Sequence, residues 1–548
     1  MNWKTHDVKN IVPELQDYNL YETDLALREA VQRLGAAAHE PSLSGYGARL
    51  GAAATLQAAE LANYHKPELH SFDRQGCRID YVAFHPAWHE MMKMLREQNL
   101  VAQPFTDSRP GAWAAYAAGF SMHGQIEPGS QCPNSMTFAC IPVLRKDPAL
   151  FQELSAKLYS TTYDSRDLPI ECKESILVGM GMTEKQGGSD LRANMTTATA
   201  ISGASSVRTY ELVGHKWFFS APMCDAHLVL ARSEKGLSCF FVPRFRPDGS
   251  KNPIQIQRLK DKVGNCSNAS SEVEFLGAWG RMVGEEGRGI QTIIEMASYT
   301  RLNCVMGSTG LLRQAVVQAL HHARHRMAFG RTLLQQPLMR NVLADLALES
   351  EAATQLMMRL AEAFAGAETD PLQRAYQRIV TPAAKYWVAK RTIEATAEAM
   401  EVLGGNGYIT DSPTGRLYRE APVISIWEGS SNVMALDMMR AIRRAPEAVA
   451  ALVDDLRPVC AGDTRLHGQL EAFCTALGYD DERYEYQSRR EAQRLILLIQ
   501  ACLLIQHAPQ DISDAFIASR FDAQWGRTFG LLPEHTQIGA ILERAWPV

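Results

Sequence analysis

The hydrophobic pattern of this chain changes period twice along the sequence, and that change limits the folds available to it. Between about Gly179 and Gly280, short apolar and aromatic runs such as TYELVGHKWFFS and AHLVLARS are separated by Gly, Pro, Asn and Asp, a pattern typical of strands. On either side, apolar residues recur three and four positions apart, which predicts amphipathic helices. We therefore expect a small β domain between two helical regions.

The two helical regions differ in organisation. From about Tyr18 to Tyr159 the pattern predicts an all-helical first domain that prolines divide into segments. From Gly289 onward, three long helical segments and a fourth after Glu428 follow one another with short links, which predicts an antiparallel four-helix bundle. Beyond Arg444, helical character continues to the end of the chain.

The fold class that follows is α+β and mainly α. The 548 residues, 46% of them hydrophobic, can bury a large core spread over several domains. We expect an N-terminal helical domain over residues 1–178, a β-sheet or barrel domain over 179–285, a four-helix bundle over 286–444 and an additional helical C-terminal extension over 445–548.

The composition indicates the cellular compartment of the protein and limits its possible binding partners. The eleven cysteines run from Cys77 to Cys502 without a CxxC pair, so they are interpreted as reduced thiols of a cytoplasmic protein without a closed metal site. The N-terminal residues lack an apolar signal region, and the most apolar run, from Leu495 to Ile505, is too short to cross a membrane. The formal net charge of -5 means that any nucleic-acid binding must come from a local patch.

One carboxylate stands out in the stretch VISIWEGSSNVMALDMMRAIRR. Glu428 lies between an apolar run and a Gly-Ser-Ser turn that opens a helix, with Ser430 or Ser431 as its N-cap. Two interpretations are open from this stretch alone. Glu428 is either an acid that serves a helix start, as acids often do, or a general base.

Four further motifs carry polar groups or exposed backbone. GMGMTEKQGGSD, from Gly179 to Asp190, combines hydroxyl groups with backbone N–H groups at a Gly-Gly turn and could bind a heterocycle or a phosphate. GHKWFFS is an aromatic strand, RMAFG ends a helix with a basic residue, and EVLGGNGY is a Gly-rich helix stop. Each has an ordinary structural explanation when it is taken alone.

Together and in this order, these motifs resemble the acyl-CoA dehydrogenase family of flavoproteins over roughly residues 180 to 445. That family has a helical domain, a β domain and a four-helix bundle, the order that periodicity predicts here. Within the family, the motifs GMGMTEKQGGSD, LSCFFVPRF, SNAS, TPAAK, LYRE and SIWEGS and the long tail are most similar to an adaptive-response branch that protects DNA from alkylation.

The resemblance implies FAD as the cofactor and assigns residues to it. Thr183 and Ser189 would contact the flavin ring or nearby substrate, and Phe218 and Ser220 would lie against another edge of the ring. Arg326 would reach the pyrophosphate of a cofactor in a neighbouring subunit, which implies a homotetramer built as a dimer of dimers. The full cofactor set that the resemblance implies is Met182, Thr183, Gln186, Gly187, Gly188, Ser189, Trp217, Phe218, Ser220, Arg326, Gln336, Gly404, Gly405, Ser430, Ser431 and Asn432.

The resemblance also decides between the two interpretations of Glu428. It falls where most members keep the base that removes the α-proton of an acyl-CoA thioester. A branched-chain subgroup keeps the base on the first bundle helix, but here that position is Thr300 followed by Arg301, and threonine cannot serve as such a base. In KDKVGNCSNAS, Cys266 stands where many members have an arginine, so a cation is missing and binding of the charged CoA tail should be weaker.

The tail motivates the remaining predictions. After Lys390, arginine is the only strongly basic residue, and the resemblance places a region for double-stranded DNA at Arg440, Arg443 and Arg444. Three functions are compared: a flavoprotein that binds duplex DNA and protects it from alkylation with weak dehydrogenase activity, a metabolic acyl-CoA dehydrogenase, and a nucleic-acid scaffold with structural FAD. A solvated helix face remains the ordinary explanation for these arginines.

Overall fold

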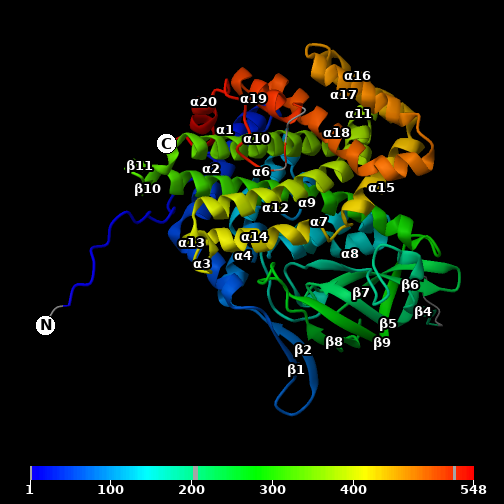
Figure 1. The fold of residues 1–548 in the computed structure, drawn as a ribbon. Helices are drawn as coiled ribbons and strands as arrows, with labels where there is room; N and C mark the ends of the chain where they lie inside the picture. Colours follow the sequence, from blue (N-terminus) through cyan, green and yellow to red (C-terminus); the bar gives the residue numbers. More distant parts are fainter. Residues whose placement is uncertain (1–2, 202–207, 523–525, 527, 548) are drawn as a thin grey trace. The chain divides into compact units, whose positions relative to one another are not determined.

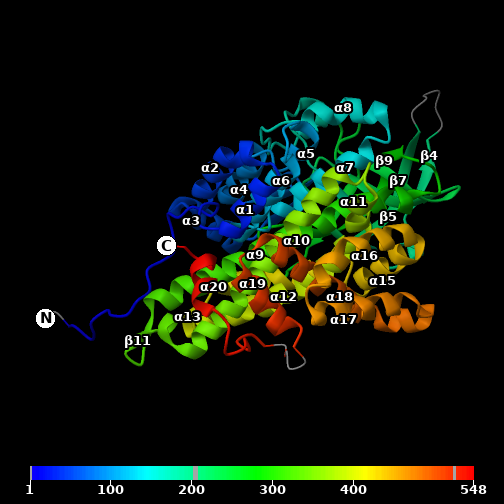
Figure 2. The same cartoon turned by 90° about the horizontal axis from the view of Figure 1, so that it is seen from above.

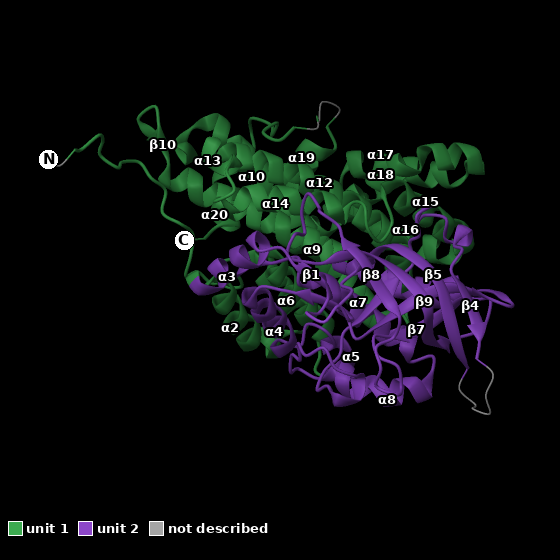
Figure 3. Cartoon of the chain, turned by 90° about the horizontal axis from the view of Figure 1, so that it is seen from below, with its two compact units in different colours: residues 1–53, 109–126, 304–548 green, residues 54–108, 127–303 purple. Residues whose placement is uncertain are grey.

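The computed structural model describes residues 3–201, 208–522, 526 and 528–547 of the chain (Figure 1). The chain divides into two compact units. Unit 1 contains residues 1–53, 109–126 and 304–548, and unit 2 contains residues 54–108 and 127–303 (Figure 3). The division falls inside helix α9 (Gly289–His325), and the N-terminal helical region contributes segments to both units.

Unit 2 contains the β domain that the period-two pattern predicts. Its strands are β3 (Val178–Gly181), β4 (Thr197–Ala200), β5 (Thr209–Ser220), β6 (Ala226–Ser233), β7 (Gly236–Pro243), β8 (Ile254–Leu259) and β9 (Ser270–Val283). They form one seven-stranded sheet of order β3-β6-β4-β5-β9-β7, in which β7 also pairs with β6 and β8 pairs with β9. Because β7 bonds to both β6 and β9, the sheet closes on itself around a core that includes Leu212, Phe219, Phe240 and Phe275.

Helices accompany this sheet in unit 2. They are α3 (Ala53–Tyr64), α4 (Pro86–Glu97), α5 (Gln103–Thr106), α7 (Gln131–Leu144) and α8 (Pro148–Tyr159). Helix α7 packs on β3, where the backbone N–H of Val178 donates to Thr137 Oγ1 at 3.0 Å. Short 3₁₀ turns in the chain lie at Ala37–His39, Ile170–Cys172, Leu191–Ala193 and Leu333–Gln335.

The expectation of a purely helical first domain is wrong in one place. Strands β1 (Glu68–Phe72) and β2 (Arg78–Ala83) form an antiparallel hairpin within it. The Asp73 carboxylate organises the turn by accepting from the N–H groups of Gln75 and Cys77. Strand β1 alternates only between exposed and half-buried positions, so its apolar pattern is too weak to reveal a strand.

Unit 1 contains the helical bundle. Its helices before the tail are α1 (Leu25–Arg33), α2 (Glu40–Gly51), α6 (Ala112–Ile126), the second part of α9, α10 (Pro337–Gly366), α12 (Thr381–Val402), α13 (Gly405–Tyr408), α14 (Pro413–Ile424) and α15 (Ser431–Arg444). Helix α12 packs against α10, α14 and α15, and Thr392 Oγ1 donates to the carbonyl of Ser308 on α9 at 3.2 Å. The predicted helix start at Ser430 is confirmed, although the Ser430 side chain makes no capping bond.

The third predicted bundle helix is interrupted. Helix α11 (Pro371–Ala375) passes into a π-helical turn (Tyr376–Val380) before α12 begins. Pro382 follows this turn and has no N–H to donate to the carbonyl four residues earlier, so the local change of helix type accommodates it. Periodicity alone does not distinguish this turn from a continuous α-helix.

The C-terminal extension is helical, as predicted, and packs on the bundle of unit 1. It comprises α16 (Pro446–Cys460), α17 (Thr464–Leu477), α18 (Asp481–His507), α19 (Gln510–Arg520) and α20 (Ile538–Ala545), coloured orange to red in Figures 1 and 2. Helix α18 packs against α10, α12 and α15. Arg520 of α19 donates to Glu349 of α10 at 3.1 Å, so buried ion pairs join the extension to the bundle. Within the described part of the chain, no helix is long and apolar enough to span a membrane.

Candidate functional site

The loop Met182–Asp190 of unit 2 is held by a buried ion pair. Lys216 of β5 and Glu184 of the loop are both inaccessible to solvent, with Nζ 2.8 Å from Oε1. Glu184 also accepts from the N–H of Met195 at 2.7 Å and from Thr196 Oγ1 at 2.7 Å, and Lys216 donates to the carbonyl of Leu230 on β6. One carboxylate and one ammonium group therefore fix this loop to β5, to β6 and to the residues just before β4.

The two charges of this pair perturb each other. Burial alone would raise the pKa of Glu184, but the hydrogen bond and charge of Lys216 lower it to about 2. Burial lowers the pKa of Lys216 to about 8, against the opposing effect of Glu184. Both groups are charged at neutral pH, so the pair holds the loop as an ion pair.

Gly188 of this loop lies close against Thr183, whereas a Cβ on Gly187 would meet nothing within 4 Å. A Cβ on Gly188 would lie 2.5 Å from Thr183 Oγ1, so no larger residue fits without moving that hydroxyl. The Thr183 carbonyl accepts from the backbone N–H of Trp217 at 2.8 Å, and the Met182 carbonyl accepts from Asn194 Nδ2. Gln186 binds Glu184 and the carbonyl of Ala193, whereas Ser189 is exposed at the mouth of the loop.

Strand β5 carries an aromatic surface next to this loop. The pairing of β5 with β9 shifts between Lys216 and Phe219, so Trp217 and Phe218 lie in a β-bulge, a feature that re-aims side chains. Phe218 is 53% exposed. Lys260 Nζ lies 3.8 Å from the Trp217 ring centroid and 4.5 Å from that of Phe218. Ser220 ends β5 and is half-buried.

In unit 1, Glu428 lies in the turn between α14 and α15. Its backbone is left-handed, with φ at 56°, which is uncommon for a residue other than glycine and indicates that its surroundings hold it there. The buried Lys385 of α12 donates from Nζ to the carbonyl of Trp427 at 2.8 Å and to that of Gly429. Trp427 Nε1 has no hydrogen-bond partner within the described part of the chain.

The region around Arg326 is a short hairpin of unit 1. Strands β10 (Met327–Ala328) and β11 (Arg331–Thr332) flank Phe329, which has φ at 50° and is 98% exposed. Gln336 N-caps α10 and donates from Nε2 to the carbonyl of Ala328 at 3.1 Å. The structure thus brings Gln336 onto the same hairpin that follows Arg326.

The other predicted residues of unit 1 lie at helix ends. Gly404 has φ at 62° after α12, and Gly405 opens α13, which confirms the predicted helix stop. Ser431 begins α15, and Asn432 Oδ1 accepts from Arg489 of α18 at 3.4 Å. On unit 2, Thr300 is buried and donates to the carbonyl of Ala297.

The three tail arginines are not equivalent. Arg440 and Arg444 are exposed on α15. Arg443 instead donates to the carbonyl of Leu477 at 2.7 Å and to that of Tyr479, pairs with Asp481 at 3.2 Å, and lies over the Tyr484 ring. Its guanidinium group is therefore committed to the end of α17 and the start of α18.

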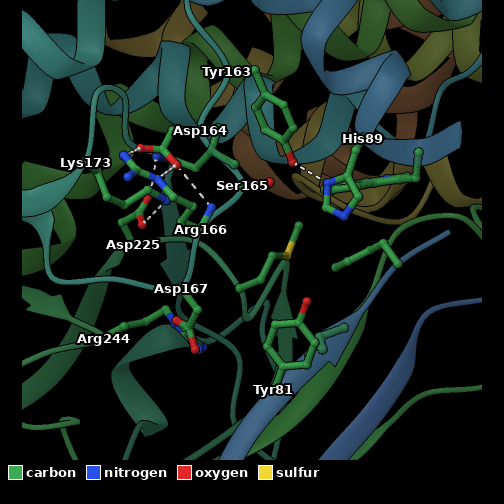
Figure 4. A pocket seen from close by; sticks show the side chains of 15 residues that line it. Tyr81, His89, Tyr163, Asp164, Ser165, Arg166, Asp167, Lys173, Asp225 and Arg244 are labelled. Carbon is green, nitrogen blue, oxygen red and sulfur yellow. Dashed lines mark hydrogen bonds and ion pairs between the residues drawn. The ribbon is translucent and has the colours of Figure 1, made fainter. Parts of the chain in front are cut away.

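A separate cavity of about 40 Å³ lies in unit 2 (Figure 4). Its charged walls are paired with one another: Lys173 with Asp225 at 2.6 Å, Arg166 with Asp164 and Arg244 with Asp167. His89 Nδ1 and the Tyr163 hydroxyl lie 2.9 Å apart. None of the predicted cofactor residues lines this cavity, so it belongs to a separate structural ion network. The described residues contain no group of three His, Cys, Asp or Glu side chains that could hold a metal ion.

Sequence reasoning assigned no role to Glu184, Lys216 or Lys385. Each lies inside a motif that was recognised, within TEKQGGSD, GHKWFFS and TPAAK. For Lys216 and Lys385 the available signal was a charge beside apolar and aromatic residues, since charged groups are rarely buried unless they are paired. Glu184 lies beside Lys185 in a polar stretch and carries no such signal. Their partners are distant in the sequence, so the pattern could not identify them.

Comparisons with known proteins identify three family domains along the chain. The adaptive response protein AidB N-terminal domain matches residues 10–165, the acyl-CoA dehydrogenase middle domain matches 179–277 and the acyl-CoA dehydrogenase C-terminal domain matches 287–443. The chain is 45% identical over 537 residues to the putative acyl-CoA dehydrogenase AidB of Escherichia coli K12, covering 96% of each chain.

Two solved structures extend the comparison. Caenorhabditis elegans ACDH-11 in complex with C11-CoA has a TM-score of 0.84 at 25% identity, covering 100% of this chain and 93% of that one. An acyl-CoA dehydrogenase from Bacillus anthracis complexed with FAD has a TM-score of 0.64 at 17% identity, covering 78% of this chain and 79% of that one, which shows the shared fold alone.

Proposed function

The chain belongs to the AidB-like branch of the acyl-CoA dehydrogenase family, and from this premise we propose that Glu428 takes the α-proton of an acyl-CoA-like thioester. Members of the family are FAD-dependent, and FAD is the cofactor of this chain. When bound, FAD would supply the acceptor for the hydride that leaves the β-carbon. Loss of the α-proton and the β-hydride together converts the saturated thioester into its α,β-unsaturated form.

The residues of unit 2 fit such a cofactor. The loop around Thr183 is fixed by the buried Lys216–Glu184 pair, and its Gly188 position has no room for a Cβ. A flat heterocycle needs backbone donors and hydroxyls that are already in place, together with apolar rings beside them. We propose that Thr183, Ser189 and the bulge residues Trp217 and Phe218 supply these contacts.

The position of Glu428 carries the proposal for unit 1. Glu428 lies in a strained turn in which Lys385 holds the carbonyls of the residues on both sides. A helix-start acid needs no left-handed backbone, and Glu428 lies two residues before Ser430, the N-cap of α15. A strained and over-determined backbone is common where a catalytic group must be aimed, which favours the general base over the helix-start acid.

Turnover of acyl-CoA substrates should be slow. Cys266 is half-buried, with Sγ 3.6 Å from the Lys262 carbonyl, and it replaces a cation that would attract the CoA phosphates. The C. elegans relative was solved with C11-CoA, which supports a CoA thioester as the ligand class.

A homotetramer should form. Arg326 is assigned to a cofactor in a neighbouring subunit, and this assignment requires an oligomer.

The test is turnover of a panel of acyl-CoAs by the unaltered protein and by Glu428→Gln. General-base catalysis contributes about 100-fold to 10000-fold, so Glu428→Gln should lose nearly all turnover and keep its flavin spectrum. Glu447→Gln, which changes an exposed acid of α16, is the matched control. Full activity of Glu428→Gln would refute the assignment, whereas brisk turnover by the unaltered protein would favour a metabolic dehydrogenase.

Duplex DNA is the second candidate ligand, with protection from alkylation as its consequence. Arg440 and Arg444 are exposed one helical turn apart on α15, so their guanidinium groups can contact neighbouring phosphates. The similarity to an adaptive-response protein supports this assignment. A salt series with unrelated duplexes tests it, because phosphate contacts make affinity depend on salt but not on sequence.

A further inference from the structure

The N-terminal arm, defined here as residues 3–17, contacts the hairpin that follows Arg326 within unit 1. Asn10 makes the central contact. Its Nδ2 donates to the carbonyl of Met327 at 2.8 Å, and its Oδ1 accepts from the N–H of Met327 at 2.8 Å. The amide side chain thus satisfies both backbone groups of Met327, as the peptide group of a neighbouring strand would.

The backbone of Asn10 contacts Arg326 as well. Arg326 Nη1 donates to the Asn10 carbonyl at 2.6 Å. Further along the arm, the carbonyl of Pro13 lies 2.8 Å from Nε2 of His321. Asn10 has φ at 57°, a left-handed conformation that asparagine tolerates better than most residues. One residue therefore holds both the guanidinium group of Arg326 and the backbone of Met327.

The hairpin has little else to hold it. Strands β10 and β11 pair through only Met327 with Thr332 and Ala328 with Arg331, and such a short isolated hairpin is marginally stable. Phe329 at its tip is exposed. The bonds from Asn10 therefore add to two others on this segment, from Gln336 to the Ala328 carbonyl and from the Leu333 N–H to the Arg326 carbonyl.

We propose that Asn10 is a positioning residue that orients Arg326 toward the pyrophosphate of FAD. The inference rests on the proposed role of Arg326. A guanidinium group has five N–H donors, and the Asn10 carbonyl accepts from Nη1 only, so the other donors can face a phosphate. Fixing the side chain before the cofactor binds reduces the ordering cost of binding.

The test titrates FAD into flavin-free protein and compares Asn10→Gly with the unaltered chain. Glycine keeps the left-handed backbone and the carbonyl that accepts from Arg326, but it removes the amide that anchors this carbonyl to Met327. Loss of the two anchoring bonds should leave the carbonyl and Arg326 less firmly placed and weaken FAD binding by roughly 10-fold. Lys9→Ala, on the same exposed arm and paired only with Asp7 among the ion pairs of the described residues, should leave the affinity unchanged. Because Asn10 is exposed, circular dichroism and the melting temperature of the flavin-free variant should match those of the unaltered chain.

Arg326→Ala provides the decisive background. If Asn10 acts through Arg326, Asn10→Gly should cost nothing further in Arg326→Ala, since a coupled pair shows a non-additive effect. If Asn10→Gly lowers FAD affinity equally in both backgrounds, or in neither, the inference is overturned. In that case the proposed function still stands, provided that the unaltered chain binds FAD. Failure of the unaltered chain to bind FAD would overturn both.

Discussion

Lys385 and Glu428 are joined through the backbone of one turn. The buried ammonium group of Lys385 bonds to the carbonyls of Trp427 and Gly429, which immediately flank Glu428. Lys385 lies on α12, and this helix packs on both α14 and α15. Lys385 therefore holds the backbone on both sides of Glu428, although it lies 43 positions earlier (428 minus 385).

Replacing Lys385 with Met should misplace Glu428 without removing it. Methionine keeps the apolar stem but leaves two carbonyls without their donor, which should cost about 1–3 kcal/mol of folding free energy. We expect the rate of acyl-CoA turnover to fall by roughly 10-fold to 100-fold because the base is no longer held in register. Steady-state kinetics and denaturant unfolding measure the two effects, and Lys390→Met on the same helix is the control. Unchanged turnover would show that the turn is rigid without Lys385.

The Lys216–Glu184 pair predicts a loss of stability in acid. The pKa of Glu184 is lowered from 4.5 to about 2 in the folded chain, so the unfolded state takes up a proton first as the pH falls. The stabilisation is present above about pH 4.5 and is lost as the pH falls to about 2. The free energy of unfolding across this range measures it. A double Glu184→Gln, Lys216→Met variant should lack this part of the acid dependence, and an unchanged profile would contradict the assignment.

The lack of space at Gly188 predicts that a larger residue at this position weakens FAD binding. An added Cβ would lie 2.5 Å from Thr183 Oγ1, so Gly188→Ala must displace the Thr183 hydroxyl. We expect FAD to bind roughly 10-fold more weakly, as for the loss of one or two hydrogen bonds, with a changed flavin absorption spectrum. Gly468→Ala on α17, where a Cβ meets nothing within 4 Å, should bind FAD normally. Equal FAD affinity of both variants would separate the Gly188 loop from the cofactor.

The sequence was sufficient for the parts of the fold that local periodicity controls. Alternation between about Gly179 and Gly280 predicted the β domain, and helical spacing predicted the long helices α9, α10 and α15. Hairpin β1–β2 was missed because β1 has no buried position and only alternates between exposed and half-buried residues. The π-helical turn before Pro382 keeps an apolar pattern that suits an α-helix.

For the candidate sites, motifs identified residues but not the contacts between distant ones. Glu428 was recognised from SIWEGS, whereas the role of Lys385 depends on the packing of α12 against the turn that holds Glu428. The pairing of Asn10 with Met327 joins residues separated by 317 positions, and no local pattern encodes such a contact. Arg443 likewise looked equivalent to its neighbours in RAIRR until α17 and α18 were positioned beside it.

The tail arginines give the last prediction, because the structure separates their roles. Arg443→Ala removes bonds to the end of α17, so it should lower the melting temperature and increase proteolysis of the tail. Arg440→Ala with Arg444→Ala changes only exposed groups of α15, so stability should be retained. If these two bind phosphates, duplex affinity should fall equally for unrelated sequences, and the log-log salt slope should decrease in magnitude by about 0.9 for each arginine–phosphate pair removed.

The control for that measurement keeps the change in charge constant. Arg457→Ala with Arg465→Ala also removes two exposed guanidinium groups from the tail, but these are paired with Glu471 and Asp463. If long-range charge alone governs binding, both double variants should weaken it alike. Selective loss with Arg440 and Arg444, while FAD remains bound, would support a DNA-binding surface on α15. An unchanged slope in that variant would instead mean that α15 presents only a solvated face and that the tail serves to stabilise the bundle.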